Sequence, residues 1–188
     1  MGTPKALLPF GSTGDVFLDR IVRSLHAGGV ADVVIVTGAD AEMIRDHIEK
    51  TGLAVRLVYN PDHDRGQLTS LKAGLEAVTG TDVSAAVVTL VDIPLFDRTT
   101  VSMLIEAHQR SHPLIVRPVS KGRHGHPVLF DRRLFQELLE ADPESGAKAV
   151  VHAHRDEIVE VHVHDEGAFI DIDTPEDYRR MTNSVIQD

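Results

Sequence analysis

The sequence has no cysteine and no tryptophan, and aromatic residues make up only 4% of its 188 residues. The absence of cysteine excludes a disulfide framework, a thiolate nucleophile and a zinc site built on thiolates. The low aromatic content argues against stacking platforms for single-stranded nucleic acid. No apolar run approaches the ~20 residues that span a bilayer, and no charged segment followed by an apolar one marks a signal peptide. We therefore expect a soluble cytoplasmic protein with no membrane partner.

The charge balance is acidic. Twenty-nine Asp and Glu residues against 19 Lys and Arg give a formal charge of -10. This charge opposes broad binding to a nucleic-acid backbone or an anionic membrane. An anionic substrate would have to be neutralised locally, by a few lysines, backbone amides or a divalent metal. The length predicts a single domain over residues 1–188.

Short β-branched runs alternate with amphipathic segments, which predicts an α/β fold. We expect strands at 32–38, 54–60, 84–92, 113–120, 126–130, 157–163 and 168–172. Helices are expected near 15–28, 40–50, 67–79, 98–111, 131–140, 146–154 and 175–182. The spacing predicts one mostly parallel sheet, with antiparallel strands added after residue 113 and helices on both faces.

Two acidic positions are candidates for chemistry. Asp92 ends the apolar run 85–91, at the edge of the sheet where α/β proteins bind ligands; the alternative is that it caps the next turn. Asp171 and Asp173 alternate with apolar residues, so a strand would place both on one face. Acids before a helix start also favour its dipole, but that does not explain the shared face. Separated carboxylates suit Mg²⁺ with a nucleoside triphosphate, and Lys5 is a candidate cation.

Glycine-rich junctions supply further candidates. In "RGQLTSLKAG" (65–74), Gly66 permits close backbone approach, and Gln67 and Ser70 offer hydrogen-bonding groups to a base or ribose. In "GRHGHPVLF" (122–130), glycines flank His124 and His126 ahead of a strand, as expected of a loop that approaches a ligand. The paired histidines of "VHAH" and "VHVH" are better explained as solvated surface residues. The sequence contains neither a nucleophile-elbow motif nor a P-loop motif.

Six stretches, in order, resemble the MobA-like nucleotidyltransferase family, and within it the molybdenum cofactor cytidylyltransferases. They are "MGTPKALLPF", "RGQLTSLKAG", "VDIP", "GHPVLF", "ESGAK" and "DIDTPEDY". The resemblance covers nearly the whole chain. It implies a Rossmann-like three-layer sandwich with a mostly parallel mixed sheet. It also implies transfer of CMP from CTP to a phosphorylated acceptor such as molybdopterin, with Mg²⁺ as cofactor and release of pyrophosphate.

The resemblance assigns roles residue by residue. Lys5 and Asp92 would be catalytic, and Asp92 and Asp173 would hold the metal. The acceptor would lie near the loop residues Gly125, His126 and Pro127. The nucleotide would be bound by Gly2, Lys5, Gly66, Gln67, Ser70 and Asp92.

The sequence departs from the family at its beginning. Family members start with a buried strand and a loop of the form Leu-Ala-Ala-Gly-x-Ser-x-Arg ahead of Met-Gly-x-Pro-Lys, whereas this sequence starts at that Met. Without the strand and loop we expect weak or absent activity and an open sheet. Two alternatives stay open. One is a non-catalytic pterin- or nucleotide-binding protein, and the other is a transferase that uses GTP or another acceptor, such as a sugar phosphate or phospholactate.

Overall fold

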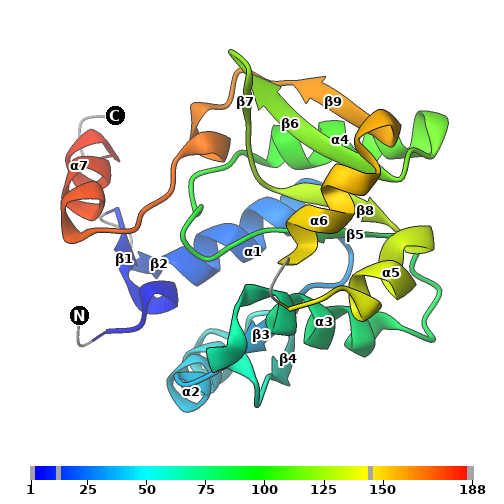
Figure 1. The fold of residues 1–188 in the computed structure, drawn as a ribbon. Coiled ribbons are helices and arrows are strands. Elements are labelled where there is room, and N and C mark those ends of the chain that lie inside the picture. Colours follow the sequence, from blue (N-terminus) through cyan, green and yellow to red (C-terminus); the bar gives the residue numbers. More distant parts are fainter. Residues whose placement is uncertain (1–2, 12–13, 144–145, 186–188) are drawn as a thin grey trace.

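The computed structural model describes residues 3–11, 14–143 and 146–185. The helices are α1 (Phe17–Ala27), α2 (Ala41–Thr51), α3 (Gln67–Val78), α4 (Arg98–Ser111), α5 (Phe135–Glu140), α6 (Gly146–Ala153) and α7 (Pro175–Val185). The strands are β1 (Pro9–Phe10), β2 (Asp15–Val16), β3 (Val34–Thr37), β4 (Arg56–Tyr59), β5 (Ala85–Val88), β6 (Ile115–Ser120), β7 (Arg123–His124), β8 (Val128–Asp131) and β9 (Ile158–His162). Figure 1 shows the strands with helices packed around them.

The described strands form three sheets. The five-stranded sheet has the order β5-β8-β6-β7, and β9 pairs with β6. Strands β6 and β9 are parallel, while the other pairs in this sheet are antiparallel. Strands β3 and β4 form a separate parallel pair, and β1 and β2 form an antiparallel hairpin.

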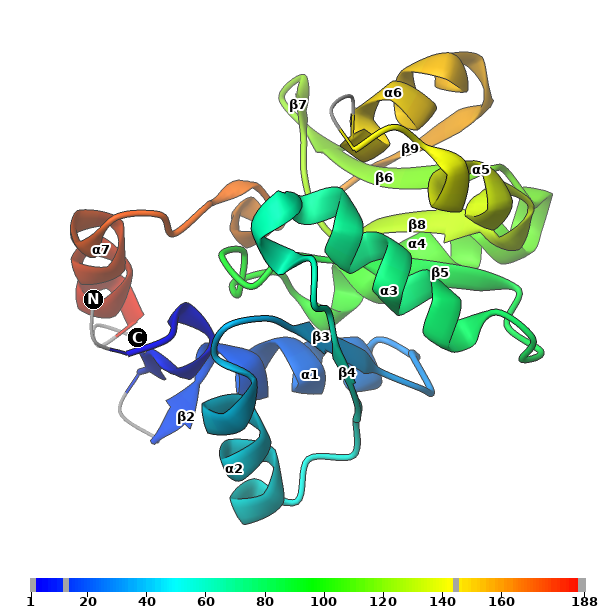
Figure 2. The same ribbon diagram turned by 60° about the horizontal axis from the view of Figure 1, so that its bottom comes forward.

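Alternating side chains bury both faces of the large sheet, which is why its strands read as continuous apolar runs. In β5, Ala86 and Val88 face a cluster that contains residues of α3, α5 and α6. Ala85 and Val87 face the opposite cluster, built on α4. Helices therefore cover both faces, and the α/β three-layer arrangement is confirmed (Figure 2).

The structure differs from the sequence prediction in how the strands pair. The predicted sheet is continuous and mostly parallel, but β3 and β4 do not pair with the five-stranded sheet in the described part of the chain. Strand β8 returns antiparallel between β5 and β6, because the short connection from β6 through β7 leaves no room for a parallel crossover. The predicted strand 168–172 was wrong: Glu166–Phe169 form a 3₁₀ helix (η5), and the chain then runs extended to α7.

An apolar cleft of about 1410 Å³ separates β3 from β5. Both strands line it over their whole length, and residues of α1 and α3 line its other sides. Although these two strands are apolar, all four residues of β5 and three of the four in β3 are only half-buried. The cleft is therefore bordered by two strand edges that no described strand covers.

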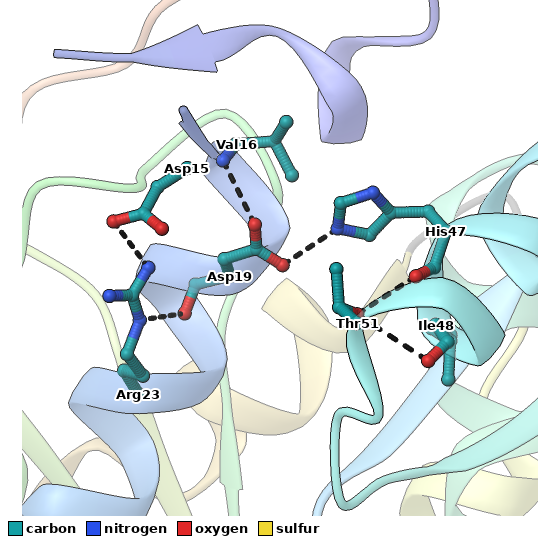
Figure 3. Close-up of polar contacts among 7 residues, drawn as sticks. All are labelled: Asp15, Val16, Asp19, Arg23, His47, Ile48 and Thr51. Atoms are coloured by element: carbon teal, nitrogen blue, oxygen red, sulfur yellow. Dashed lines mark hydrogen bonds and ion pairs between the residues drawn. The ribbon is translucent and has the colours of Figure 1, made fainter. Parts of the chain in front are cut away.

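Helix α1 begins at a polar cluster that joins it to α2. The carboxylate of Asp19, in the first turn of α1, accepts a hydrogen bond from the Val16 backbone N–H at 3.1 Å. Its other oxygen lies 2.7 Å from Nε2 of His47 on α2. Arg23, one helical turn after Asp19, forms an ion pair with Asp15 at 2.6 Å (Figure 3). Asp19 thus both caps α1 and connects it to α2.

The chain end packs back on the beginning. Thr174 and Asp177 exchange hydrogen bonds as a capping box at the start of α7, as its sequence predicts. Tyr178 Oη then donates to the Pro9 carbonyl at 2.9 Å. No helix among the described residues is both long enough and apolar enough to cross a membrane.

Candidate active site

Three distant segments meet at the end of β5. Asp92 lies in the turn after that strand, and its backbone carbonyl accepts a hydrogen bond from the Ile172 N–H at 2.8 Å. Ile172 itself is buried at 2% exposure, so its side chain anchors the segment in the core. Asp171 and Asp173 flank it and are both exposed. The hydrogen bond therefore holds two further carboxyl groups beside Asp92 without any regular strand.

Lys5 joins this group from the opening segment. It begins the short 3₁₀ helix η1 (Lys5–Leu7), and its Nζ lies 3.0 Å from Oδ1 of Asp173. The lysine is half-buried and the aspartate is exposed. The two residues are 168 positions apart in the sequence. Their contact shows that the opening and closing segments build one site.

Asp92 occupies an unfavourable environment for a carboxylate. Burial raises its pKa above the usual value, the nearby Lys5 lowers it, and the charges of Asp173 and Asp171 raise it again. Its Oδ1 atom is buried and forms no hydrogen bond with the described residues. An ionised oxygen without a donor is costly unless a cation or a donor group meets it. Asp92 is therefore suited to bind a cation.

A second wall of the site comes from the loop between β7 and β8. The His126 N–H donates to the Ala168 carbonyl at 2.8 Å, which fastens the loop to η5. A Cβ at Gly125 would lie 2.4 Å from that same carbonyl oxygen, so only glycine fits there. Burial lowers the pKa of the His126 ring, against the opposing effects of the Val88 backbone and of Asp171 and Asp92. Burial therefore favours the neutral form of this ring beside the carboxylates.

These elements enclose a small cavity of about 280 Å³. Its walls combine two carboxyl groups, two imidazoles and apolar surface. The lining residues are Leu90, Asp92, Ile93, His124, Gly125, His126, Ala168, Phe169 and Asp171. No lysine or arginine is among the described residues that line the cavity, so an anionic ligand there would need a cation from elsewhere.

The predicted nucleotide side lies at the start of α3. Gly66, which precedes this helix, has a φ of 106°, a conformation that side chains rarely adopt. Gln67 and Ser70 line the large cleft. The side-chain amide of the buried Asn60 donates to Thr69 at 2.8 Å and to Ser70 at 3.1 Å, which fixes the first turn of α3. The start of the helix is thus rigidly positioned at the cleft.

The sequence predictions can be placed one by one. The structure brings six of the predicted residues to the lining of the large cleft: Lys5, Gln67, Ser70, Asp92, Gly125 and His126. Asp173 is not among the described residues that line the cleft, but it forms an ion pair with Lys5, which does line it. Gly66 and Pro127 adjoin lining residues, but they are not among the described residues that line the cleft. Gly2 lies outside the described residues.

The sequence reading missed several residues of the site. Ala168 and Phe169 were assigned to a strand, yet they form the back wall of the small cavity. Asn60 ends the predicted strand 54–60 and lies six positions before Gly66, so nothing in the sequence singles it out. Its role follows from the fold, which brings its buried amide to the first turn of α3.

Residues 1–158 match the family described as "MobA-like NTP transferase domain". The chain belongs to this family. Members of the MobA-like family are named for nucleoside triphosphate transfer, and the chain is accordingly of nucleotidyltransferase type.

Two curated relatives differ in how much of their length is matched. The "Bifunctional IPC transferase and DIPP synthase" of Rubrobacter xylanophilus is 41% identical over 75 residues, which is 39% of this chain and 17% of that protein. The chain thus spans about a sixth of the length of this relative. The "Molybdenum cofactor cytidylyltransferase" of Escherichia coli is 24% identical over 179 residues, covering 95% of this chain and 86% of that one.

A solved structure confirms the fold. The chain is similar to Rv0371c of Mycobacterium tuberculosis H37Rv, solved in complex with manganese, with a TM-score of 0.75 and 26% identity. The match covers 97% of this chain and 93% of that one. The chain therefore has the same fold as Rv0371c over nearly the full length of both proteins.

Proposed function

We propose that this MobA-like chain is a cytidylyltransferase that transfers CMP from CTP to a phosphorylated acceptor, with molybdopterin as the favoured acceptor. The observation that carries the proposal is the meeting of Lys5, Asp92, Asp171 and Asp173 at the mouth of the cleft. A lysine among three carboxylates suits a triphosphate and its metal ion. The similarity to the E. coli molybdenum cofactor cytidylyltransferase supports the choice of base and acceptor.

The carboxylates fit a divalent cation. Asp92 presents a buried oxygen without a hydrogen-bond partner, and Asp171 and Asp173 lie close enough to affect its pKa. The described residues hold no ready cluster of three or more His, Cys, Asp or Glu ligands. That is compatible with Mg²⁺, which takes one or two protein carboxylates and completes its shell with water and phosphate oxygens. Asp92 and Asp173 are the proposed ligands, and the bound ion would neutralise charge on the phosphates.

The proposed reaction forms one bond and breaks one. An oxygen of the acceptor phosphate attacks the α-phosphorus of CTP, the bond from that phosphorus to the bridging oxygen breaks, and pyrophosphate leaves. Lys5 would stabilise the negative charge that develops on the phosphates. Gln67 and Ser70 would position the base or ribose, and the loop at His126 would position the acceptor. Positioning and charge stabilisation then supply most of the rate enhancement.

One comparison favours a different acceptor. The higher identity to the bifunctional IPC transferase, although over a short match, supports a second candidate in which the same cytidylyl transfer serves the acceptor of that enzyme. The described lining of the cavity at His126 includes no lysine or arginine, so it favours neither acceptor on charge.

Calorimetric titration with CTP and with GTP, each with Mg²⁺ and with EDTA, tests the nucleotide site. We expect CTP to bind in the presence of Mg²⁺ and to bind more weakly in EDTA. Asp92→Asn should lower the affinity for Mg·CTP by about 10- to 100-fold, because it removes a charged ligand. Asp156→Asn, at a side chain that is 92% exposed, is the matched control and should bind as the unsubstituted protein does.

Other results of the titration would contradict parts of the proposal. Metal-independent binding would support a carrier rather than a transferase, and a preference for GTP would overturn the choice of base. Release of pyrophosphate in the presence of molybdopterin, compared with release in the presence of sugar phosphates, then identifies the acceptor class.

A further inference from the structure

Three cationic side chains line the large cleft among the described residues, apart from its histidines. They are Lys5, Arg117 and Lys148. Lys5 is bound to Asp173 at 3.0 Å. Arg117 donates to Glu160 through Nε and Nη2, at 3.2 and 2.6 Å. Lys148 is exposed, and no described hydrogen bond or ion pair engages its ammonium group.

The position of Lys148 is fixed by packing. It lies in the first turn of α6, and its neighbour Ala147 packs with Val150 and Val151 in the same apolar cluster as Leu71 and Leu75 of α3. Lys72 of α3 also donates to the carbonyl of Ala141, the residue that follows α5, at 2.7 Å. Helix α6 is thus held against α3, the helix that carries the proposed nucleotide residues Gln67 and Ser70.

An uncompensated cation in this place is unexpected. The protein carries a net charge of -10, so an exposed lysine has many carboxylates available for pairing. The acidic residues that line the cleft are Asp32, Asp40, Asp82 and Asp92, and none of them pairs with Lys148 in the described structure. A free ammonium group on the wall of a cleft is suited to bind a phosphate as a point charge.

We propose that Lys148 is a second phosphate-binding cation of the nucleotide site and contacts the β- or γ-phosphate of the nucleoside triphosphate. This inference rests on the proposed function and adds to it. It assigns a role to Lys148, the lysine of "ESGAK", which is one of the six stretches on which the family resemblance rests. Lys5 and Lys148 would then approach the triphosphate from η1 and from α6, two elements on different sides of the cleft.

Titration of Mg·CTP and Mg·CMP into Lys148→Gln, Lys148→Arg and the unsubstituted protein tests the proposal. Lys148→Gln should weaken Mg·CTP binding by about tenfold at low salt, and raising the ionic strength should shrink this difference because the site is exposed. Lys148→Arg should recover most of the affinity, since the charge is kept. Binding of CMP, which has no β- or γ-phosphate, should not change. Lys50→Gln, at an exposed position on α2 outside the cleft lining, is the control and should change neither affinity.

The outcomes separate this inference from the proposed function. If the unsubstituted protein does not bind CTP, the proposed function fails. If it binds CTP and Lys148→Gln binds equally well, only the role of Lys148 fails. An equal loss of CMP affinity would overturn the assignment to the β- or γ-phosphate, and a loss that Lys148→Arg does not recover would point to the packing of α6. If Lys148→Gln changes only how the rate depends on the concentration of the acceptor, Lys148 contacts the acceptor and not CTP, and the proposal is wrong.

Discussion

Asp131 shows how a buried acid away from the candidate site is stabilised. It ends β8 at 6% exposure, and one carboxylate oxygen accepts hydrogen bonds from the backbone N–H and the Nε of Arg133. The other oxygen lies 2.8 Å from Nε2 of the buried His108. Burial alone would raise the pKa of this carboxyl group, but the bonds from Arg133 and His108 outweigh it and lower the pKa to about 2.

This shift predicts how stability depends on acid. The pKa in the unfolded chain is about 3.9, so the ionised Asp131 contributes about 2 kcal/mol of stability above that pH. The contribution is lost as the pH falls from about 4 through about 2. Asp131→Asn should lower the free energy of unfolding at pH 7 and flatten its decline below pH 4. Urea denaturation at a series of pH values measures both effects, and an unchanged acid slope in the variant would contradict the assignment.

At the scale of single residues, the sequence predicted which residues lie at the candidate site better than it predicted the contacts that each of them makes. Asp92 was predicted because a carboxylate that ends an apolar run must lie at the rim of the sheet. The alternation in the sequence treats Asp171 and Asp173 alike, and only the resemblance assigns the metal to Asp173. The contact of Asp173 with Lys5, 168 positions away, exists only in the folded chain and could not be predicted. Lys148 lies in "ESGAK", one of the stretches behind the resemblance, but the sequence assigns it no role, because that role rests on its lack of a partner among the described residues.

At the level of elements, the α-helices of the described residues lie within a few residues of the predicted ranges, including the short α5 and α6, because apolar residues recur at helical spacing in these segments. The strand expected at 168–172 failed for a physical reason. Its alternation of apolar and acidic residues is real, but only Ala168 and Ile172 are buried, Ile170 is 41% exposed, and no strand among the described residues pairs with the segment. Alternation of apolar and polar residues predicts that one face of a segment is buried. A β-strand also needs a neighbouring strand with which it can pair.

Asp19 and His47 give a prediction about how two elements are joined. Asp19 caps α1 and contacts α2 through His47, as Figure 3 shows. Asp19→Ala should lower the free energy of unfolding by about 2 kcal/mol, because it leaves the Val16 N–H without its partner and removes the link to α2. His47→Gln removes only the link and should cost about half as much.

Urea denaturation measures both variants, with Asp46→Asn on the exposed side of α2 as the control, expected within about 0.5 kcal/mol of the unsubstituted protein. Hydrogen exchange supplies the more specific readout, because losing the link should speed exchange in α2 more than in α4. Uniform acceleration across both helices would show that the pair stabilises the whole fold instead.

For the molecule as a whole, the sequence predicted the layers but not the division of the sheet. Each apolar run predicts a buried strand, and nothing in a run specifies which other run it pairs with. The cleft of about 1410 Å³ between β3 and β5 could accept one more strand, because it offers two strand edges that no described strand covers and apolar walls from α1 and α3.

The cleft predicts that an added strand will stabilise the protein. A segment of five or six β-branched apolar residues and a glycine-rich loop, fused ahead of Met1, should raise the free energy of unfolding by about 2 kcal/mol or more, because it pairs both edges and covers apolar surface. A fused segment of equal length with serine and glutamine at the apolar positions is the control. Urea denaturation measures the gain, and binding of a hydrophobic dye should fall only with the apolar segment. Equal stabilisation by both segments would show that the cleft does not select a strand. A gain confined to the apolar one, accompanied by tighter binding of Mg·CTP, would connect the occupancy of the cleft to nucleotide binding.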